Sequence, residues 1–148
     1  MSRYFEDFEV GQNFRSRGRT VTEAHLVAFA GLSGDFIELH TNEEYARLSV
    51  FGARIAPGAL VFSMATGLAA QMELINETVI AFYGVDRLRF TKPVFIGDTV
   101  RLEKRVVEKK EKDEERGLVT FETSVLNQEG ETVLAYRDKL LLKRKKRA

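Results

Sequence analysis

The second half of the chain alternates between apolar and polar residues with the two-residue period of a β-strand. Between 118 and 126, the odd-numbered residues share one face, whereas Thr120, Glu122 and Ser124 share the other. Similar patterns predict strands over 79–90, 98–109 and 132–142. Turn residues separate the strands at Gly97-Asp98, Gly117 and Glu129-Gly130. Because no helix is predicted between these strands, we expect them to form an antiparallel sheet.

The first half predicts a short strand followed by helices. Residues 14–21 are consistent with a strand, and Thr22 is a suitable N-cap for a helix that ends near Gly34. A loop is expected from Gly34 to His40, and Thr41 is placed as the cap of a second helix that runs to about Leu48. The clearest helix covers residues 58 to about 74. It is apolar nearly all the way round, so protein is expected to surround it.

One long buried helix and an antiparallel sheet together define an α+β domain. The simplest arrangement is a curved sheet wrapped around the helix, which is the hot-dog fold. The 148 residues fit a single domain, taken as residues 1–148. One helix covers a long sheet incompletely, so we expect exposed apolar surface to be buried in a homodimer or a higher homo-oligomer.

The composition narrows the range of partners. With 44% hydrophobic and 30% charged residues, the chain is typical of a globular protein. Lys and Arg total 23 against 22 acidic residues, so the net charge of +1 gives no reason to expect nucleic-acid binding. The basic residues 143–147 are interpreted as a solvated strand end. The absence of cysteine excludes disulfides, cysteine-bound metals and thiol nucleophiles.

One uncharged segment, residues 55–72, approaches the roughly 20 residues that a membrane-spanning helix needs. Pro57-Gly58 near its start and the polar Ser63 and Thr66 instead favour a core helix of a water-soluble protein, so no membrane contact is predicted. Residues 1–10 lack the apolar core of a signal peptide, and the resulting expectation is a cytoplasmic location.

Candidate chemistry is concentrated between Gly34 and His40. Asp35 and His40 lie five residues apart, and a turn of the intervening chain can direct both side chains toward one small volume. A histidine pKa of about 6.5 suits proton transfer near neutrality, and a neighbouring carboxylate can orient the ring or hold a water molecule with it. The two residues are therefore a candidate acid–base pair. The competing interpretation is structural: Asp35 ends a helix and His40 satisfies a backbone carbonyl.

Further candidates lie around the start of the long helix. Gly58 begins that helix after Pro57, and backbone N–H groups at a helix N-terminus can stabilise negative charge on a thioester oxygen. Thr66 follows about two turns later and offers a hydroxyl group, although bonding to its own helix backbone is the simpler role. Arg54 and Pro57 are assigned to substrate binding, with Arg54 as the first candidate for a coenzyme A phosphate.

Several motifs along the chain can be compared with those of known families. They are Ala30-Gly31-Leu32-Ser33-Gly34-Asp35-Phe36, Leu39-His40, Ile55-Ala56-Pro57-Gly58, the opening from Tyr4 to Gly11, and the hairpin from Phe90 to Thr99. Together they resemble the MaoC-like, (R)-specific enoyl-CoA hydratases, and the resemblance covers most of the chain. The signature of that family is Ser/Thr-Gly-Asp-x-Asn-Pro-Leu/Ile-His, followed by an Ile-x-x-Gly segment that starts the hot-dog helix.

The resemblance implies reversible syn addition of water to a trans-2-enoyl-CoA. It implies that Asp35 and His40 hold the water, that His40 activates it for attack at C3, and that Asp35 helps to deliver a proton to C2. Gly58 takes the place of the oxyanion donor, and Thr66 that of a residue supporting the acid. Neither a metal nor a redox cofactor is implied, because coenzyme A is part of the substrate.

The chain departs from the signature at Ile37-Glu38, where the family has Asn-Pro. Isoleucine cannot supply the hydrogen bonds of asparagine, and the stiffening effect of proline is lost. Two alternatives to hydration therefore stay open. One is a hot-dog acyl-CoA thioesterase, in which a carboxylate activates water against the thioester carbonyl, although the Asp35–His40 spacing speaks against it. The other is a non-catalytic acyl-CoA-binding or regulatory protein.

Overall fold

The computed structural model describes residues 1–147. A six-stranded antiparallel sheet has the order β1-β4-β5-β6-β3, and β2 also pairs with β4. The strands are β1 (Asn13–Arg15), β2 (Arg19–Thr20), β3 (Val79–Phe90), β4 (Thr99–Glu111), β5 (Arg116–Leu126) and β6 (Thr132–Lys143). The helices are the 3-10 turn η1 (Phe5–Asp7), α1 (Glu23–Ser33), α2 (Glu38–Thr41), α3 (Glu43–Arg47) and α4 (Gly58–Gln71).

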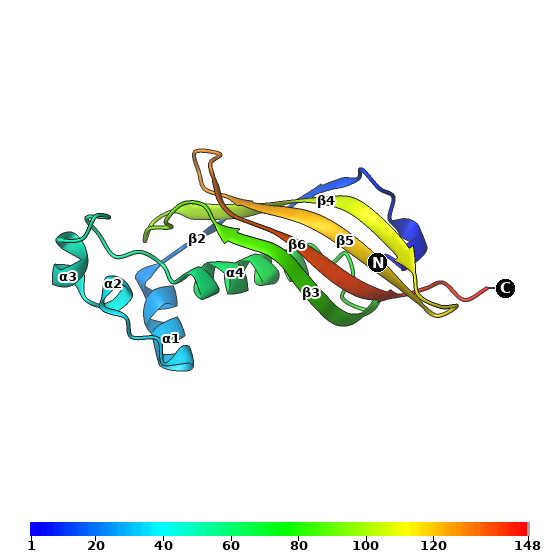
Figure 1. Ribbon diagram of the computed structural model, residues 1–148, viewed down its shortest axis with the longest axis horizontal. Helices are drawn as coiled ribbons and strands as arrows, with labels where there is room; N and C mark the ends of the chain where they lie inside the picture. Colours follow the sequence, from blue (N-terminus) through cyan, green and yellow to red (C-terminus); the bar gives the residue numbers. More distant parts are fainter. Residues whose placement is uncertain (148) are drawn as a thin grey trace.

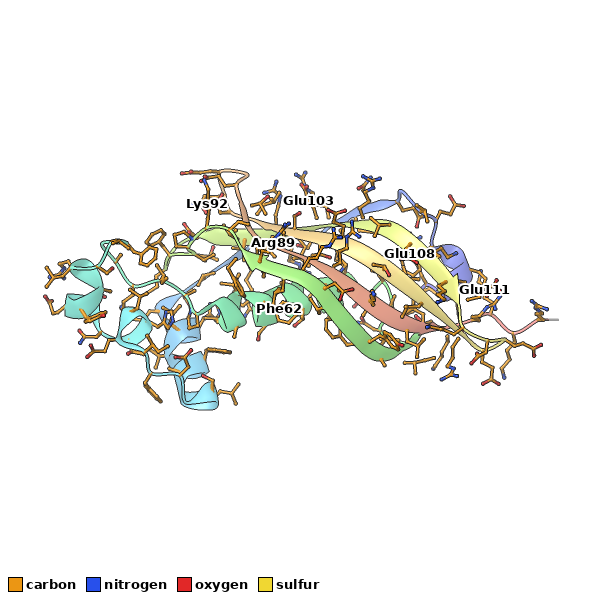
Figure 2. All side chains as sticks on the ribbon, viewed as in Figure 1. Phe62, Arg89, Lys92, Glu103, Glu108 and Glu111 are labelled. Atoms are coloured by element: carbon orange, nitrogen blue, oxygen red, sulfur yellow. The ribbon has the colours of Figure 1, made fainter. Side chains whose placement is uncertain are left out.

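Helix α4 lies against one face of the curved sheet, and α1, α2 and α3 gather beyond one end of it (Figure 1). This is the hot-dog arrangement predicted from the sequence. Strand alternation decides which side chains meet the helix. On β4, Leu102, Lys104 and Val106 are buried, whereas the intervening Glu103 and Arg105 are exposed. Figure 2 shows Glu103 on the side of the sheet away from α4.

Two hydrophobic clusters fill the inner face of the sheet. The larger cluster joins α4 to the sheet through residues such as Leu60, Met64 and Leu68. The smaller cluster lies beyond the C-terminal end of α4 and is built around Phe8 and Phe121, whose rings meet edge to face at 5.6 Å. The core is therefore divided along the length of the sheet, and the division lies near the last turns of α4.

The four long strands agree with the sequence-based boundaries to within about two residues, but Gly117 was wrongly expected to form a turn. It lies inside β5, where a Cβ atom would come within 2.3 Å of the Phe5 ring. The glycine is needed for close packing of the N-terminal segment against the sheet. The turn is formed instead by residues 112–115, between β4 and β5.

The helical predictions also need correction. Thr22 is the N-cap of α1 as expected, but His40 lies in the one-turn helix α2 and not in a loop. The cap of the next helix is Asn42, whose side chain accepts a hydrogen bond from the Tyr45 N–H, and not Thr41. The expected strand over 14–21 is divided into β1 and β2 by residues 16–18.

Helix α4 ends at Gln71, about one turn earlier than expected, and protein does not surround it completely. One stripe of small residues is exposed along it, namely Ala59, Ser63, Thr66 and Ala70. Among the residues that the structure describes, no helix is both long and apolar enough to cross a membrane.

Candidate active site

His40 is held by a hydrogen bond that defines its tautomer. Its Nδ1 atom lies 2.7 Å from the carbonyl oxygen of Ile55. Because a carbonyl oxygen can only accept, Nδ1 must carry the proton. In the neutral ring, Nε2 is then left with its lone pair and can act as a base. The backbone-carbonyl contact foreseen as a structural alternative is therefore present, and it leaves the other ring nitrogen available for chemistry.

The carbonyl that orients His40 belongs to a segment fixed by the sheet. Ile55 forms an isolated antiparallel bridge with Phe95, and the N–H of Ala56 donates to the carbonyl of Val94 at 2.7 Å. These contacts attach the chain before α4 to the turn that precedes β4. The position of His40 is thus tied to the sheet through a single short chain of hydrogen bonds.

Gly58 stands at the N-terminus of α4, in the same cleft as His40. The N-cap residue Pro57 provides no side-chain hydrogen bond, so the first N–H groups of α4 have no side-chain cap. A Cβ atom on Gly58 would lie 2.9 Å from the Phe90 ring, so only glycine fits without displacing that ring. The cleft has a volume of about 580 Å³, and Ile55, Phe90 and Val94 also line it. His40 and the uncapped, positive end of α4 therefore share one cleft.

Asp35 lies just after the end of α1. Gly34 closes that helix in the left-handed conformation, with a φ of 78°, and the N–H of Asp35 then donates to Ser33 Oγ at 3.1 Å. The Asp35 carboxylate accepts a hydrogen bond from the Ile37 N–H at 3.3 Å. The side chain is half-buried and does not line the cleft of His40 and Gly58. The structure thus brings together His40 and Gly58, but not Asp35, within one chain.

Arg54 is occupied by protein carboxylates. Its guanidinium contacts Glu23 of α1 and Glu43 of α3, each at 2.7 Å, and its side chain is only 11% exposed. The hydrogen bond to Glu23 and, to a lesser degree, that to Glu43 raise its pKa. A phosphate group would compete with these two acids for a guanidinium that is largely buried. The geometry favours a clamp between α1 and α3, placed directly before the Ile55 carbonyl that orients His40.

Neither Thr66 nor Pro57 lines the cleft of His40 and Gly58. The Thr66 hydroxyl donates to the Ser63 carbonyl at 2.8 Å, as expected for a threonine bonding to its own helix. It lines a different cavity, about two turns along α4 from Gly58. Pro57 is buried at the N-cap, next to the cleft but not among the residues that line it.

The sequence reasoning missed a buried polar row on the inner face of the sheet. It consists of Lys104 on β4, Thr123 on β5 and Asp138 on β6. The Lys104 ammonium and the Asp138 carboxylate are 2.5 Å apart, and both side chains are almost completely buried. The signal was available, because Lys104 has the same strand parity as Leu102 and Val106, which predicts an inward-facing charge.

The fold and the cleft define a class of protein. It is a hot-dog domain in which a histidine and the N-terminus of the central helix line one cleft. Residues 7–128, well over half of the chain, match the family described as MaoC like domain. The chain belongs to this MaoC-like hydratase/dehydratase family.

Among the curated relatives are Protein MaoC and (R)-specific enoyl-CoA hydratases. The chain is 40% identical over 100 residues to Protein MaoC of Klebsiella aerogenes, a match over 68% of this chain and 29% of that protein. It is 41% identical over 97 residues to an (R)-specific enoyl-CoA hydratase of Rhodospirillum rubrum, covering 66% and 65% of the two chains. These matches span less than two thirds of either relative. An (R)-specific enoyl-CoA hydratase of Aeromonas caviae is 34% identical over 84% of this chain and 88% of its own length.

Solved structures agree with the fold over nearly the whole chain. A structure described as a monoamine oxidase regulatory protein from Archaeoglobus fulgius superimposes with a TM-score of 0.91, at 41% identity, over 98% of this chain and 97% of that one. A MaoC-like dehydratase from Rhodospirillum rubrum gives a TM-score of 0.88 at 30% identity, over 99% and 100% of the two chains.

Proposed function

We propose that this protein catalyses the reversible hydration of trans-2-enoyl-CoA to (R)-3-hydroxyacyl-CoA. The observation that carries the proposal is the hydrogen bond from His40 Nδ1 to the Ile55 carbonyl, which leaves Nε2 as a base in the cleft of Gly58. The names of the relatives support a hydro-lyase, and the match between chain and family supports a thioester substrate. Acid–base chemistry of this kind requires neither a metal nor a redox cofactor, and coenzyme A enters as part of the substrate.

The proposed steps use the His40 ring, the Gly58 N–H and the Asp35 carboxylate. His40 Nε2 takes a proton from water while the water oxygen bonds to C3 of the enoyl group. Electron density moves through C2 onto the thioester oxygen, which accepts a hydrogen bond from the N–H of Gly58. A proton is then returned to C2, and the oxygen regains its carbonyl bond. The family resemblance assigns help in this step to Asp35, and that role requires its carboxylate to turn from the Ile37 N–H toward the cleft. The sum is the addition of one water molecule.

The loop at Ile37-Glu38, where the family has Asn-Pro, is held by other hydrogen bonds. Ile37 is the N-cap of α2 and has no side-chain cap, whereas the Asp35 carboxylate accepts the Ile37 N–H and so takes over the shaping of the loop. The Glu38 side chain is exposed and accepts a hydrogen bond from Asn42. Glu38 therefore points toward α3 and adds no partner to His40. These contacts support a competent loop without the family's Asn-Pro.

We also propose that the protein is a homodimer that pairs through β3. Within residues 1–147 this strand pairs with β6 alone and is an edge of the sheet, and an open edge pairs readily with another strand. It exposes large apolar side chains, including Ile80, Phe82, Tyr83 and Leu88. A twofold axis can place a second copy of β3 antiparallel to the first, so that the same residues cover one another. Light scattering should give twice the chain mass, and Leu88→Glu should give the monomer mass.

The function is tested by supplying a short trans-2-enoyl-CoA and following the loss of its conjugated double bond. We expect (R)-3-hydroxyacyl-CoA as the product, identified by chiral chromatography, and no release of free coenzyme A. Release of coenzyme A without hydration would support the thioesterase instead. Binding of the thioester with no change in it would support the non-catalytic alternative. Either result would overturn the proposed function.

A further inference from the structure

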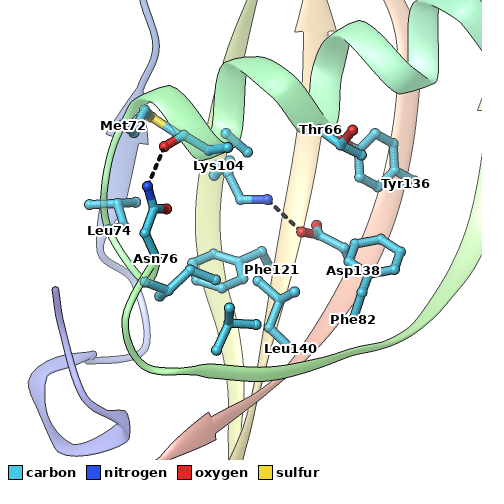
Figure 3. Close-up of a pocket in the computed structure, with 14 residues that line it drawn as sticks. Thr66, Met72, Leu74, Asn76, Phe82, Lys104, Phe121, Tyr136, Asp138 and Leu140 are labelled. Atoms are coloured by element: carbon cyan, nitrogen blue, oxygen red, sulfur yellow. Dashed lines mark hydrogen bonds and ion pairs between the residues drawn. The ribbon is translucent and has the colours of Figure 1, made fainter.

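A second cavity lies beneath the C-terminal half of α4, between the two hydrophobic clusters (Figure 3). Its volume is about 200 Å³, more than the roughly 150 Å³ of an engineered cavity that takes up benzene. Its walls are mostly apolar, with contributions from Ala69, Phe82, Phe121 and Leu140. The hydration chemistry proposed above uses none of these residues. We call this cavity the distal pocket.

The polar row closes one side of the distal pocket. Lys104 and Asp138 both line it, and Figure 3 shows their ion pair facing the cavity. One carboxylate oxygen of Asp138 binds the Lys104 ammonium at 2.5 Å, and the other accepts a hydrogen bond from the Thr123 hydroxyl at 2.6 Å. The side chains of Lys104 and Asp138 are only 4% and 3% exposed. A complete ion pair is thus buried in an otherwise apolar pocket.

The ion pair has hydrogen-bonding capacity left over. Asp138 holds the only hydrogen-bond acceptor found for Lys104 Nζ among residues 1–147, and an ammonium has three donors. A second N–H direction is covered by the Phe121 ring, whose centroid is 4.8 Å from Nζ. The Asp138 carboxylate has about four lone-pair sites and accepts hydrogen bonds from two donors, Lys104 and Thr123. One donor and further acceptor positions therefore remain beside the cavity.

The Tyr136 hydroxyl adds no charge beside the ion pair. Tyr136 lines the distal pocket, and burial, followed by the nearby Asp138 carboxylate, raises the pKa of its hydroxyl. The phenol is neutral near pH 7, and Lys104 and Asp138 cancel each other. The pocket is therefore polar at one point but carries no net charge.

An exposed stripe of α4 runs from the His40 cleft to the distal pocket. Ala59 lines the cleft, whereas Thr66 and Ala70 line the distal pocket, and Ser63 lies between them on the same exposed stripe. Thr66 is eight positions after Gly58, which is about 12 Å along a helix axis. An extended chain advances about 1.2 Å per bond, as three backbone bonds cover 3.3–3.6 Å. A chain of about ten carbons, held by its thioester at Gly58, reaches the distal pocket.

We propose that the distal pocket receives the far end of a medium-length acyl chain, and that Lys104 and Asp138 select a chain that ends in a hydroxyl group. This inference rests on the proposed function, because it places the thioester at Gly58. It assigns substrate selection to residues on β4 and β6, far along the sheet from the reacting atoms.

The chemistry of the ion pair favours a hydroxyl over the two other common chain ends. A hydroxyl can accept a hydrogen bond from Lys104 and donate one to Asp138. A methyl end would exclude water from the pair and satisfy neither group, which is unfavourable for a buried charge. A carboxylate would add a net negative charge beside Asp138 in an apolar pocket, where the described lining residues provide no cation besides Lys104.

The test compares three trans-2-enoyl-CoA substrates of ten carbons that end in a methyl, a hydroxyl or a carboxylate. A four-carbon substrate, too short to reach the distal pocket, serves as the reference. The readout is the kcat/KM of each long substrate divided by that of the reference. We expect the hydroxyl chain to exceed the methyl chain about tenfold, because hydrogen bonds to charged groups are worth at least this factor. Equal ratios, or a preference for the carboxylate, would refute the inference.

A variant removes the polar row as a unit: Lys104→Met, Thr123→Val and Asp138→Leu together. Replacing a whole buried ion pair with apolar residues is often neutral or stabilising, so this variant is expected to fold. It should prefer the methyl chain, and a retained preference for hydroxyl would exclude the ion pair as its cause. A second variant, Ala69→Leu, fills the pocket without touching the pair. It should lower the ratios of all three long substrates.

The outcomes separate this inference from the proposed function. If the four-carbon substrate is hydrated but the long substrates show no dependence on chain end, only the distal-pocket inference fails. If no substrate is hydrated, the proposed function fails. Calorimetric binding of saturated ten-carbon acyl-CoA esters then tests the pocket alone, and tighter binding of the hydroxyl ester that disappears in the triple variant would still support it.

Discussion

Arg54 provides a test that separates two roles for one residue. The sequence suggested a contact with a coenzyme A phosphate, whereas the structure shows a clamp to Glu23 and Glu43 at 2.7 Å each. The residue next to it, Ile55, provides the carbonyl that orients His40. We predict that Arg54→Met frees this segment and shifts the imidazole. In that case Arg54 is a positioning residue for His40 and not a phosphate ligand.

The expected magnitudes follow from the geometry. Glu23 and Glu43 are 61% and 50% exposed, so each ion pair contributes at most about 1 kcal/mol to stability. Arg54→Met should thus lower the free energy of unfolding by about 1–2 kcal/mol and leave the protein folded. The effect on turnover should be larger, since a misplacement of about 1 Å in a catalytic group can reduce the rate about a hundredfold. We expect kcat to fall between about tenfold and a hundredfold.

The assay compares an enoyl-CoA with the corresponding pantetheine thioester, which lacks the nucleotide phosphates. A positioning role predicts that Arg54→Met lowers kcat equally for both substrates and changes neither KM by much. Arg47→Met is the matched control, because Arg47 is also paired with a glutamate but is 60% exposed on α3. A rise in KM that is confined to the coenzyme A substrate would refute the positioning role and restore the phosphate contact.

Two further predictions concern stability. Lys104→Met alone leaves the buried Asp138 carboxylate without its cation and should lower the free energy of unfolding in urea by about 3–5 kcal/mol. The triple variant of the polar row should lower it far less. A single variant as stable as the triple variant would contradict this reasoning. The hydrogen bond from Lys145 lowers the pKa of Asp7 in the folded protein. The contact therefore stabilises the fold at pH values above the unfolded pKa of about 4. This contribution is lost as the pH falls through the lower pKa that Asp7 has in the folded protein. Asp7→Asn should therefore be less stable than wild type at pH 7, and the difference in unfolding free energy should shrink below about pH 4; a difference independent of pH would exclude this origin.

The sheet could be predicted from the sequence because strand period and turn residues act locally. The predicted strand 79–90 coincides with β3, and the Glu129-Gly130 turn is present, with Gly130 at a φ of 76°. Gly117 misled the prediction because its reason is not local. The Phe5 ring that requires this glycine lies more than a hundred residues earlier in the chain, and no pattern around 117 reveals it.

The candidate site was predicted in part. The family resemblance assigned His40 and Gly58 to one site, and the two residues line the same cleft. The placement of Asp35 outside that cleft depends on the end of α1 and on the Ile37 N–H, which the spacing alone could not define. The clamp role of Arg54 depends on Glu23 and Glu43, which only the folded chain brings together.

The central claim is that His40 is the catalytic base in a cleft shared with Gly58. The most direct measurement is the kcat/KM for hydration of a short trans-2-enoyl-CoA by wild type, His40→Ala and Asp35→Asn, each checked for folding by circular dichroism. His25→Ala is the control, since His25 contacts Thr22 at the start of α1 and lies outside the cleft. We predict that His40→Ala lowers kcat/KM by about a hundredfold to ten-thousandfold while His25→Ala retains it. Wild-type activity in a folded His40→Ala variant would contradict the account.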